Sequence, residues 1–544
     1  MQKKHMVLGL AAMLCGSVSC TNLDEKVYSE LVADSYYNNR TEVMTAVLRP
    51  FTHANAWAAP TGQVGYWRVS ELSGDQLAWP QKGIHGFDGG QWIRLHYHTW
   101  TVEDDIVWNP WRLIFWGIGF CNNTISDLEK LDFNKIGMTD ADKASIIAET
   151  KALRAWHYLR LLDLYGIIPI VTQVGEPAKP HTASRKEVWE FIEKELRENV
   201  EKLQPLGPSM VGRVSKAAGY AMLAELYINS QKWTGVVKWD ECVAVCNKII
   251  NGEAGSLKGA APALETDIVK PFTNVNHTSP ENLFQIAYNQ TKGKFRFGFH
   301  GDMWHYVQWQ AYNAVDRGNN GIVVVPSAYD AFADNDLRKK TWMLIDTLKK
   351  HPTVRANEAD SVVMATEEYK GKPLVFVKEI RRNSEGETGA GGMTRGEENS
   401  GARFAKYLPG TKDDAEFWNN DFVLYRLAEI ILYKAEAIMR KNGGVANGEA
   451  VTLVNSVRQR AFLPTDWTSA AYTTATLTLD ELLAERGREF IFEGKRRQDL
   501  IRFGKFTSAT WWDHAASSAK AELFPIPARQ IRLNQNLKQN EGYN

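Results

Sequence analysis

The sequence is poor in cysteine, and the few cysteines form neither a disulfide framework nor a metal-binding pattern. Five occur in 544 residues. Cys15 and Cys20 fall in the N-terminal segment. This leaves Cys121, Cys242 and Cys246, an odd number that cannot all pair within one chain. Cys242 and Cys246 lie one helical turn apart, a poor separation for a relaxed disulfide. No C-x-x-C pair or His/Cys set occurs, so we expect no zinc site.

An excess of either charge is also absent. Lys plus Arg and Asp plus Glu each total 64, so the formal net charge is zero. A nucleic-acid-binding protein usually carries a basic excess or a concentrated basic face. The most basic stretch, LAERGREFIFEGKRRQDLIRFGKF at 483–506, contains Glu485, Glu489, Glu493 and Asp499. Because these acids balance it locally, the stretch predicts ion pairs between helices rather than a phosphate-binding surface.

A long hydrophobic run is missing, and the one short run lies at the N-terminus. MVLGLAAML follows Lys3 and Lys4 and is too short to span a bilayer. It leads into GSVSC, which resembles a bacterial lipobox, although Ser17 stands where leucine is more usual. We therefore predict a lipoprotein signal peptide at 1–19 and lipidation of Cys20. The alternative is an ordinary secretory signal cut nearby.

Catalytic and metal-binding motifs are not found either. The sequence has no G-x-S-x-G elbow and no phosphate-binding loop. His96 and His98 alternate on a possible strand close to acidic residues, but such a pair is more often a packed structural feature than a metal site. Glu71 and Asp75 could be imagined as a hydrolytic pair, yet acidic pairs are common in any long chain. We expect no enzyme activity, no cofactor and no metal.

Aromatic residues, in contrast, are abundant, with 19 Trp and 19 Tyr. Many fall in two segments without helical periodicity, at about 62–110 and 255–419. Irregular loops on a rigid scaffold are where binding sites usually lie. Sugar rings offer an apolar face that indole or phenol rings cover, so these segments are candidates for a glycan site. Trp100, Trp108, Trp111 and Trp116 adjoin helical sequence and are predicted to belong to the core.

The remaining sequence is strongly helical. Ala217, Ala221, Ala224 and Ile228 recur on one face, and their small size lets a neighbouring helix approach closely. DFVLYRLAEIILYKAEAIMR, at 421–440, is expected to form one helix, and TLDE at 478–481 marks the start of another. ENLFQIAYN and KPLVFVKEI are predicted to be short strands. The pattern predicts a mainly α fold in which tetratricopeptide-like helix pairs, an α-solenoid scaffold, pack against an irregular, loop-rich region with a few short strands.

The sequence resembles the SusD/RagB family over nearly its whole length. The matching segments, in family order, are SCTNLDEKVYS, CNNTI, AETKALRAWHYLRLLDLYGIIPIV, GRVSKAAGYAMLAELYI, DFVLYRLAEIILYKAEAI, VNSVRQRAF, ERGREFIFEGKRRQDLIRFGKF and FPIPARQIRLNQNLKQNEGY. The resemblance implies one domain at 20–544. Its helical scaffold lies at about 41–60, 111–254 and 420–507, its ligand-binding portions at about 62–110 and 255–419, and an irregular C-terminal segment at 508–544.

The resemblance also suggests where the ligand binds. Family members place a ligand-contacting Asp and Trp in the early irregular segment, where Asp75 and Trp92 match best, and further aromatics in the later one. Arg395, in a glycine-rich loop, could bind hydroxyl groups. The predicted ligand-binding residues are Asp75, Trp79, Trp92, Trp304, Tyr306, Trp309 and Arg395. The acidic residues Glu481, Glu485, Glu489 and Glu493 are instead predicted to pair with Arg458, Arg460, Arg486 and Arg488 in a scaffold lattice.

The function implied by the resemblance is capture of oligosaccharide or polysaccharide at the cell surface. Its expected partners are a glycan, a TonB-dependent outer-membrane transporter of the SusC type, and the outer membrane, in which the lipid on Cys20 would anchor the protein facing the exterior. The acidic residues after Cys20, in TNLDEK, resemble a surface-export signal. The alternatives are a binder of peptides or another nutrient, a surface glycoside hydrolase, and a structural lid for the transporter.

Overall fold

The computed structural model describes residues 37–60, 64–175, 179–291, 299–312, 317–350, 361–410 and 418–543. The predicted signal peptide and the lipidation site Cys20 lie outside these residues. Within them, no helix combines the length and the apolar character needed to cross a membrane.

Helices account for most of the regular structure. The longer ones are α3 (Arg40–Ala58), α6 (Asp105–Lys130), α7 (Asp140–Tyr165), α8 (Arg185–Asn199), α9 (Lys216–Ile228), α11 (Trp239–Ile250), α15 (Leu427–Lys441), α16 (Gly448–Arg458) and α18 (Leu479–Phe490). The shorter ones are α4 (Tyr66–Leu72), α5 (Gln91–His96), α10 (Ser230–Thr234), α12 (Phe299–Met303), α13 (Pro326–Asp330), α14 (Leu337–Thr341), α17 (Trp467–Ala470), α19 (Arg496–Arg502) and α20 (Ala528–Leu533).

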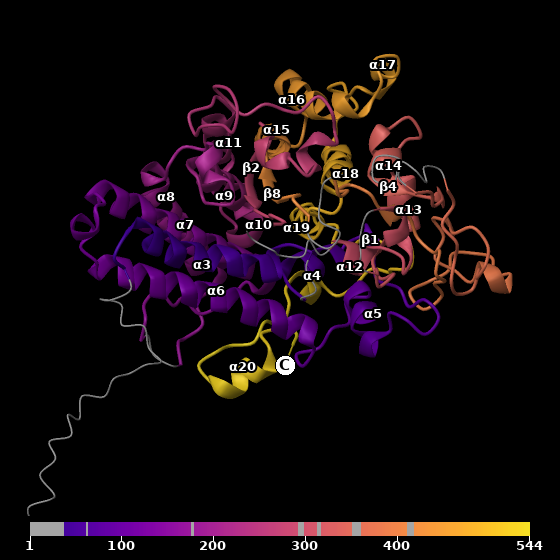
Figure 1. Cartoon of the computed structure of the whole chain (residues 1–544), viewed down its shortest axis with the longest axis horizontal. Helices are drawn as coiled ribbons and strands as arrows, with labels where there is room; N and C mark the ends of the chain where they lie inside the picture. The colour runs from indigo at the N-terminus through magenta and orange to yellow at the C-terminus, as the bar shows by residue number, and fades with distance from the viewer. Residues whose placement is uncertain are drawn as a thin grey trace, which may run out of the picture.

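The long helices pack against one another largely in chain order. Helix α6 contacts α3 and α7, α7 contacts α8, α9 contacts α11, and α15 contacts both α11 and α16. Figure 1 shows these helices filling the left and upper parts of the molecule, with the loop-rich part on the right. The predicted small-residue face of α9 is buried, including Ala217, Ala221 and Ala224. The mainly helical fold with paired helices is therefore confirmed.

The strands are short and form antiparallel pairs. β1 (Leu77–Ala78) pairs with β3 (Val323–Val324), β2 (Asn282–Ile286) with β8 (Phe422–Arg426), β4 (Met343–Leu344) with β7 (Arg403–Phe404), and β5 (Asp346–Thr347) with β6 (Val375–Phe376). The predicted strands in ENLFQIAYN and KPLVFVKEI correspond to β2 and β6. The β1–β3 pair joins the two irregular segments of the sequence, so it brings the early and late candidate residues into one region.

Two local predictions were wrong. The segment expected to form one helix at 421–440 is divided, because its first residues, aromatic and branched, form β8 and pair with β2 before α15 begins at Leu427. His96 and His98 do not lie on a strand: His96 ends α5, and His98 has a positive φ of 55°. Both histidine rings are buried, and none of the described residues forms a group of three or more metal-ligating side chains suited to an ion.

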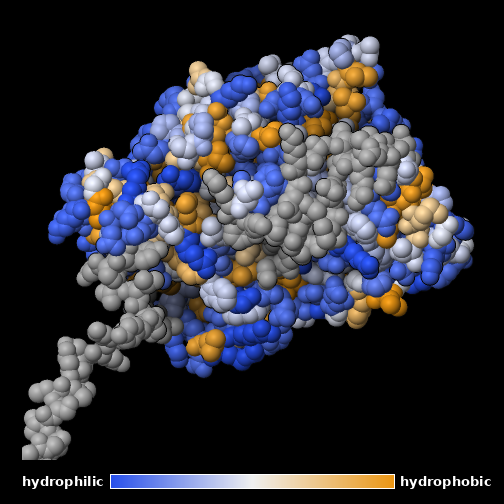
Figure 2. Space-filling view, in the orientation of Figure 1, coloured by the Kyte–Doolittle hydropathy of each residue, from blue (hydrophilic) through white to orange (hydrophobic). Residues whose placement is uncertain are grey.

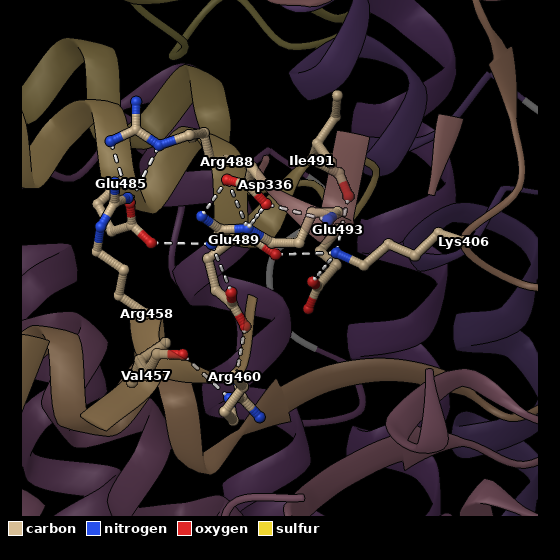
Figure 3. Close-up of polar contacts among 12 residues, drawn as sticks. Asp336, Lys406, Val457, Arg458, Arg460, Glu485, Arg488, Glu489, Ile491 and Glu493 are labelled. Atoms are coloured by element: carbon tan, nitrogen blue, oxygen red, sulfur yellow. Dashed lines mark hydrogen bonds and ion pairs between the residues drawn. The ribbon is translucent and has the colours of Figure 1, made fainter. Parts of the chain in front are cut away.

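The predicted scaffold lattice is present (Figure 3), with Glu485 and Glu489 buried at its centre, Arg458, Arg460 and Arg488 partly buried, and Glu481 exposed at its edge. Glu489 on α18 accepts from Arg426 at 2.7 Å, Arg460 at 2.7 Å and Arg338 at 2.9 Å. Glu485, one turn earlier, pairs with Arg338 at 2.8 Å and also with Arg458 and Arg488. Burial alone would raise the pKa of Glu489, but the surrounding cations outweigh burial and lower it to about 2.

The lattice differs from the prediction in three places. Glu493 does not continue the helix face, because α18 ends at Phe490, yet its carboxylate still pairs with Lys406 at 2.6 Å and with Arg426. Arg486 points elsewhere and binds Asp499 at 2.9 Å. Arg338, Arg426 and Lys406 come from the irregular region and from β8, so the lattice fastens the loop-rich part to the helices as well as helix to helix.

Candidate ligand-binding site

The structure brings Trp79 and Trp92 together, but it buries them. Their rings stack with centroids 4.8 Å apart and planes 8° from parallel. The Arg68 guanidinium lies 5.4 Å and 5.3 Å from the two ring centroids, and the Trp92 indole nitrogen donates to Asp88 at 2.6 Å. With 6% and 3% of their surfaces exposed, these indoles support the overlying loop and have no open face for a sugar ring.

Asp75 and Trp304 also interact mainly with the protein itself, although Asp75 keeps 20% of its side chain exposed. Both carboxylate oxygens of Asp75 accept from Arg496 on α19, at 2.6 Å and 2.8 Å, so this acid extends the scaffold ion pairs. Trp304 is fully buried and packs against Tyr312 and Trp418, with centroids 4.8 Å and 5.3 Å away. Trp304 therefore has no exposed face for a ligand, and the Asp75 carboxylate is already paired with Arg496.

Tyr306, Trp309 and Arg395 are more accessible. Tyr306 is half-buried, and its ring lies 5.0 Å from the exposed ring of His85. Trp309, in a short 3-10 turn, is partly buried against the core. Arg395 is exposed and donates to Glu387 at 2.9 Å. Its neighbour Gly396 pairs with Lys82, so the glycine-rich loop borders the segment that carries His85.

A hollow of about 450 Å³ opens beside Tyr306. We call it the Tyr306 groove. It is lined by the residues 82–85, Tyr306, the residues 366–368, Lys370 and Glu398. Its volume lies within the usual range for small-molecule sites. The groove combines two aromatic rings with hydroxyl, carboxylate and ammonium groups, which suits a ligand that has both apolar faces and many hydroxyl groups.

Buried charges make the floor of the groove rigid. The Glu398 carboxylate binds His305 at 3.2 Å and accepts from the backbone N–H groups of Thr366, Glu367 and Tyr369. Burial opposes ionisation, but these hydrogen bonds outweigh it and lower the pKa of Glu398 to about 2. The Lys82 ammonium donates to two backbone carbonyls, at 2.6 Å and 2.7 Å. The floor therefore holds its shape without a ligand.

Some groups that line the groove have no partner among the described residues. The Thr366 hydroxyl is buried there without a hydrogen bond. Neither the exposed Glu367 carboxylate nor the exposed Lys370 ammonium has an ion-pair or hydrogen-bond partner within the described parts of the chain. The exposed Glu367 carboxylate thus offers an acceptor and the exposed Lys370 ammonium a donor at the lining of the hollow, and both can bind the hydroxyl groups of a ligand.

The loop that carries His85 also exposes two large hydrophobic residues, of which Ile84 lines the groove. Ile84 is 91% exposed and Phe87 is 51% exposed. Figure 2 shows a hydrophobic cluster at the lower right of the molecule, where the segment preceding α5 runs in Figure 1. Gly86 has a φ of 76° and a Cβ there would lie 3.1 Å from the Trp79 ring, so glycine allows this loop to lie directly on the buried indoles.

Sequence reasoning located the region but missed Ile84, His85, Phe87 and Thr366. The available signal was the glycine spacing of GIHGFDGG, which predicts a turn-rich loop with exposed tips. The density of tryptophans in the sequence favoured instead Trp79 and Trp92, whose rings lie beneath that loop. Large aromatic side chains are as common in cores as in ligand sites, and sequence alone does not separate the two.

Two family profiles match the chain. One, described as SusD family, matches residues 280–543, and another, described as starch-binding associating with outer membrane, matches residues 23–228. The chain belongs to the SusD/RagB family. The starch-binding protein SusD of Bacteroides thetaiotaomicron is 27% identical over 433 residues, which is 75% of this chain and 74% of that protein.

Solved structures of the SusD superfamily share the fold. Surface glycan-binding protein A from Bacteroides thetaiotaomicron, in complex with laminarihexaose, aligns with a TM-score of 0.70 at 21% identity, over 92% of this chain and 99% of that one. A laminarin-binding SusD-like protein aligns with a TM-score of 0.68 at 20% identity, over 93% of this chain and 100% of that one. At these identities the likeness establishes the SusD fold for this chain.

Proposed function

We propose that this SusD/RagB protein is a surface lipoprotein of the outer membrane that captures glycan and delivers it to a SusC-like TonB-dependent transporter. The observation that carries the proposal is the Tyr306 groove, in which aromatic rings and unpartnered polar groups face one hollow. Family membership supports the same function, because a relative is named as starch-binding and a structural neighbour was solved with a glucan.

The ligand contacts proposed for this function differ from those that the sequence suggested. Tyr306 and His85 would stack against sugar rings, with Glu367 and Lys370 binding hydroxyl groups. Phe87 and Ile84 would meet the chain at the mouth, and Arg395 would approach it from the glycine-rich loop. Trp79 and Trp92 would act beneath the loop by fixing its shape. Each stacked ring that removes some 50 Å² of apolar surface contributes roughly 1 kcal/mol.

Binding without hydrolysis is the proposed mode of action. Glycosidases need a carboxylic acid of raised pKa beside the scissile bond. Glu398, which lines the Tyr306 groove, has the opposite shift, to a pKa of about 2, and its oxygens are already hydrogen-bonded. Glu71 has a pKa raised to about 8 by burial, but it is fully enclosed and accepts from Gly494 in the scaffold.

Native affinity electrophoresis tests the proposal. The mature protein is run through gels that contain plant, fungal, fructan or host polysaccharides, and the recovered glycan is assayed for new reducing ends. Retardation without new reducing ends supports glycan capture. Retardation with product release would indicate a hydrolase. Migration unchanged by every glycan would remove the glycan proposal and favour a peptide, another nutrient or a structural lid.

A further inference from the structure

Helix α6 carries a second aromatic surface, on the helical side of the molecule. Trp108, Arg112 and Trp116 recur at every fourth residue and so share one face of the helix. Both tryptophans were predicted to lie in the core with Trp100 and Trp111. Trp100 and Trp111 are buried, but Trp116 is 51% exposed and Trp108 is half-buried. A large indole held open to solvent is a candidate for recognition.

Arginines hold the two indoles in place. The Arg112 guanidinium lies 4.7 Å from the ring centroid of Trp116, and that of Arg529, which lies on α20, is 5.8 Å from Trp108. Arg529 is neutralised by Asp105 at 3.2 Å, whereas Arg112 has no acidic partner and binds only Asn109 at 3.2 Å among the described residues. The rings are therefore fixed by cation–π contacts, and one guanidinium keeps donor capacity.

A hollow of about 360 Å³ separates this face of α6 from the segment that contains α20. We call it the α6–α20 groove. Trp108, Arg112 and Trp116 line one side, Gln530 and Leu533 the other, and Pro180 closes part of it. Leu533 is 69% exposed at the rim. The Arg112 Nε atom has no hydrogen-bond partner among the described residues. The indole N–H groups of Trp108 and Trp116 have none among these residues either.

We propose that the α6–α20 groove is a second carbohydrate-binding site, which takes a neutral glycan chain. Indole faces suit the apolar face of a sugar ring, and the unpartnered donors suit hydroxyl oxygens. Trp108 and Trp116 are eight residues apart, or about 12 Å along the axis at 1.5 Å per residue. One extended oligosaccharide can therefore contact both rings, with Arg112 and Gln530 between them.

The position of this groove makes it independent of the Tyr306 groove. Figure 1 places α6 and α20 along the lower left of the molecule, and α12 and α13, which flank the Tyr306 region in sequence, on the right. When one groove has bound a long polysaccharide, the rest of that chain is held near the other groove at a high effective concentration, so binding there becomes more favourable. The proposal does not rest on the Tyr306 groove, because each site can bind alone.

The test compares Trp116→Ala and Trp108→Ala with wild type in native gels that contain laminarin or amylopectin. Trp467→Ala is the matched control, because its half-buried indole lies on α17 at the opposite edge of the molecule in Figure 1. Truncating Trp116 should weaken retardation by at least one of these glucans about fivefold or more, Trp116→Phe should restore part of it, and Trp467→Ala should change nothing.

Tyr306→Ala, run beside these variants, separates this proposal from the function proposed above. Loss of retardation in Trp116→Ala but not in Tyr306→Ala supports the α6–α20 site and removes the Tyr306 site. Wild-type retardation in both Trp116→Ala and Trp108→Ala overturns the second site, as does failure of wild type to be retarded by either glucan. Loss of a transporter contact without any change in glucan retardation also overturns it, since the groove would then be a protein-docking surface.

Discussion

The Glu489 carboxylate on α18 lies 2.7 Å from the guanidinium of Arg426, the last residue of β8. Arg426 also reaches Glu281 at 2.9 Å, directly before β2. One arginine therefore ties the central strand pair to the last long helix. The most basic stretch of the sequence, at 483–506, therefore supplies buried ion pairs that join the helical and loop-rich parts of the fold.

Replacing Glu489 with glutamine should destabilise the fold strongly. Arg426, Arg460 and Arg338 would lose a shared anion, and breaking a buried ion pair by removing one partner costs about 3–5 kcal/mol. Denaturant unfolding measures the change. Lys186→Ala, which removes an exposed pair with Glu190, should have almost no effect. Glycan affinity of the folded Glu489→Gln protein should match wild type, and a large loss of affinity at full stability would move this cluster into a binding site.

Acid should unfold the protein through the same cluster. Glu489 has a folded-state pKa of about 2, below its ordinary value of 4.5, so its contribution is complete above pH 4.5 and is lost as the pH falls toward 2. A depression of this size corresponds to about 3 kcal/mol. Unfolding free energies measured between pH 6 and pH 3 should fall steeply in wild type and less steeply in Glu489→Gln. Equal slopes for the two proteins would contradict this assignment.

Trp304→Ala should reduce stability rather than specifically remove ligand contacts. The indole is fully buried between Tyr312 and Trp418, and large-to-small core substitutions of this kind cost about 3–5 kcal/mol. Thermal unfolding followed by circular dichroism measures the loss. A variant with wild-type stability and much weaker glycan binding would restore Trp304 to the ligand site, as the sequence first suggested.

Membrane attachment should depend on Cys20. The motive is the sequence GSVSC, which resembles a lipobox and follows two lysines and a short apolar run, as a lipoprotein signal does. Cys20→Ala should leave the outer-membrane fraction when cells are fractionated in a strain that lacks the transporter. Cys15→Ala is the control and should stay attached. Retention of the Cys20→Ala protein in the membrane would rule out the lipobox assignment.

Some features of this chain follow from sequence because their physical causes are local. Helical periodicity predicted α9 and its buried alanine face, and the Thr478 cap predicted the start of α18, where the Thr478 side chain accepts from the Glu481 backbone at 3.1 Å. The charge balance predicted the ion-pair lattice. The helix and its cap depend on residues a few positions apart, for which spacing and residue type are sufficient. The lattice partners Arg338 and Arg426 come from distant segments and were not predicted.

The features that were missed depend on contacts between distant segments. Residues 422–426 form a strand because β2 lies 136 or more residues earlier in the chain and is available for pairing, as the Gln285–Asp421 hydrogen bond illustrates. Trp79 and Trp92 are buried because the glycine loop folds over them, whereas Trp116 keeps 51% of its surface exposed where it lines the α6–α20 groove. Burial of an aromatic ring is decided by tertiary packing, which composition does not encode.

The central claim, glycan binding in the Tyr306 groove, is tested most directly by calorimetric titration of an oligosaccharide of the glycan that retards the wild-type protein in gels. Wild type, Tyr306→Ala and the control Trp467→Ala are compared with and without chelator, after circular dichroism has established that each is folded. Loss of a stacked ring should weaken binding by about 1–2 kcal/mol, or roughly five- to thirtyfold, in Tyr306→Ala alone. Chelator should have no effect. Wild-type affinity in the folded Tyr306→Ala protein would contradict the account and place the ligand elsewhere.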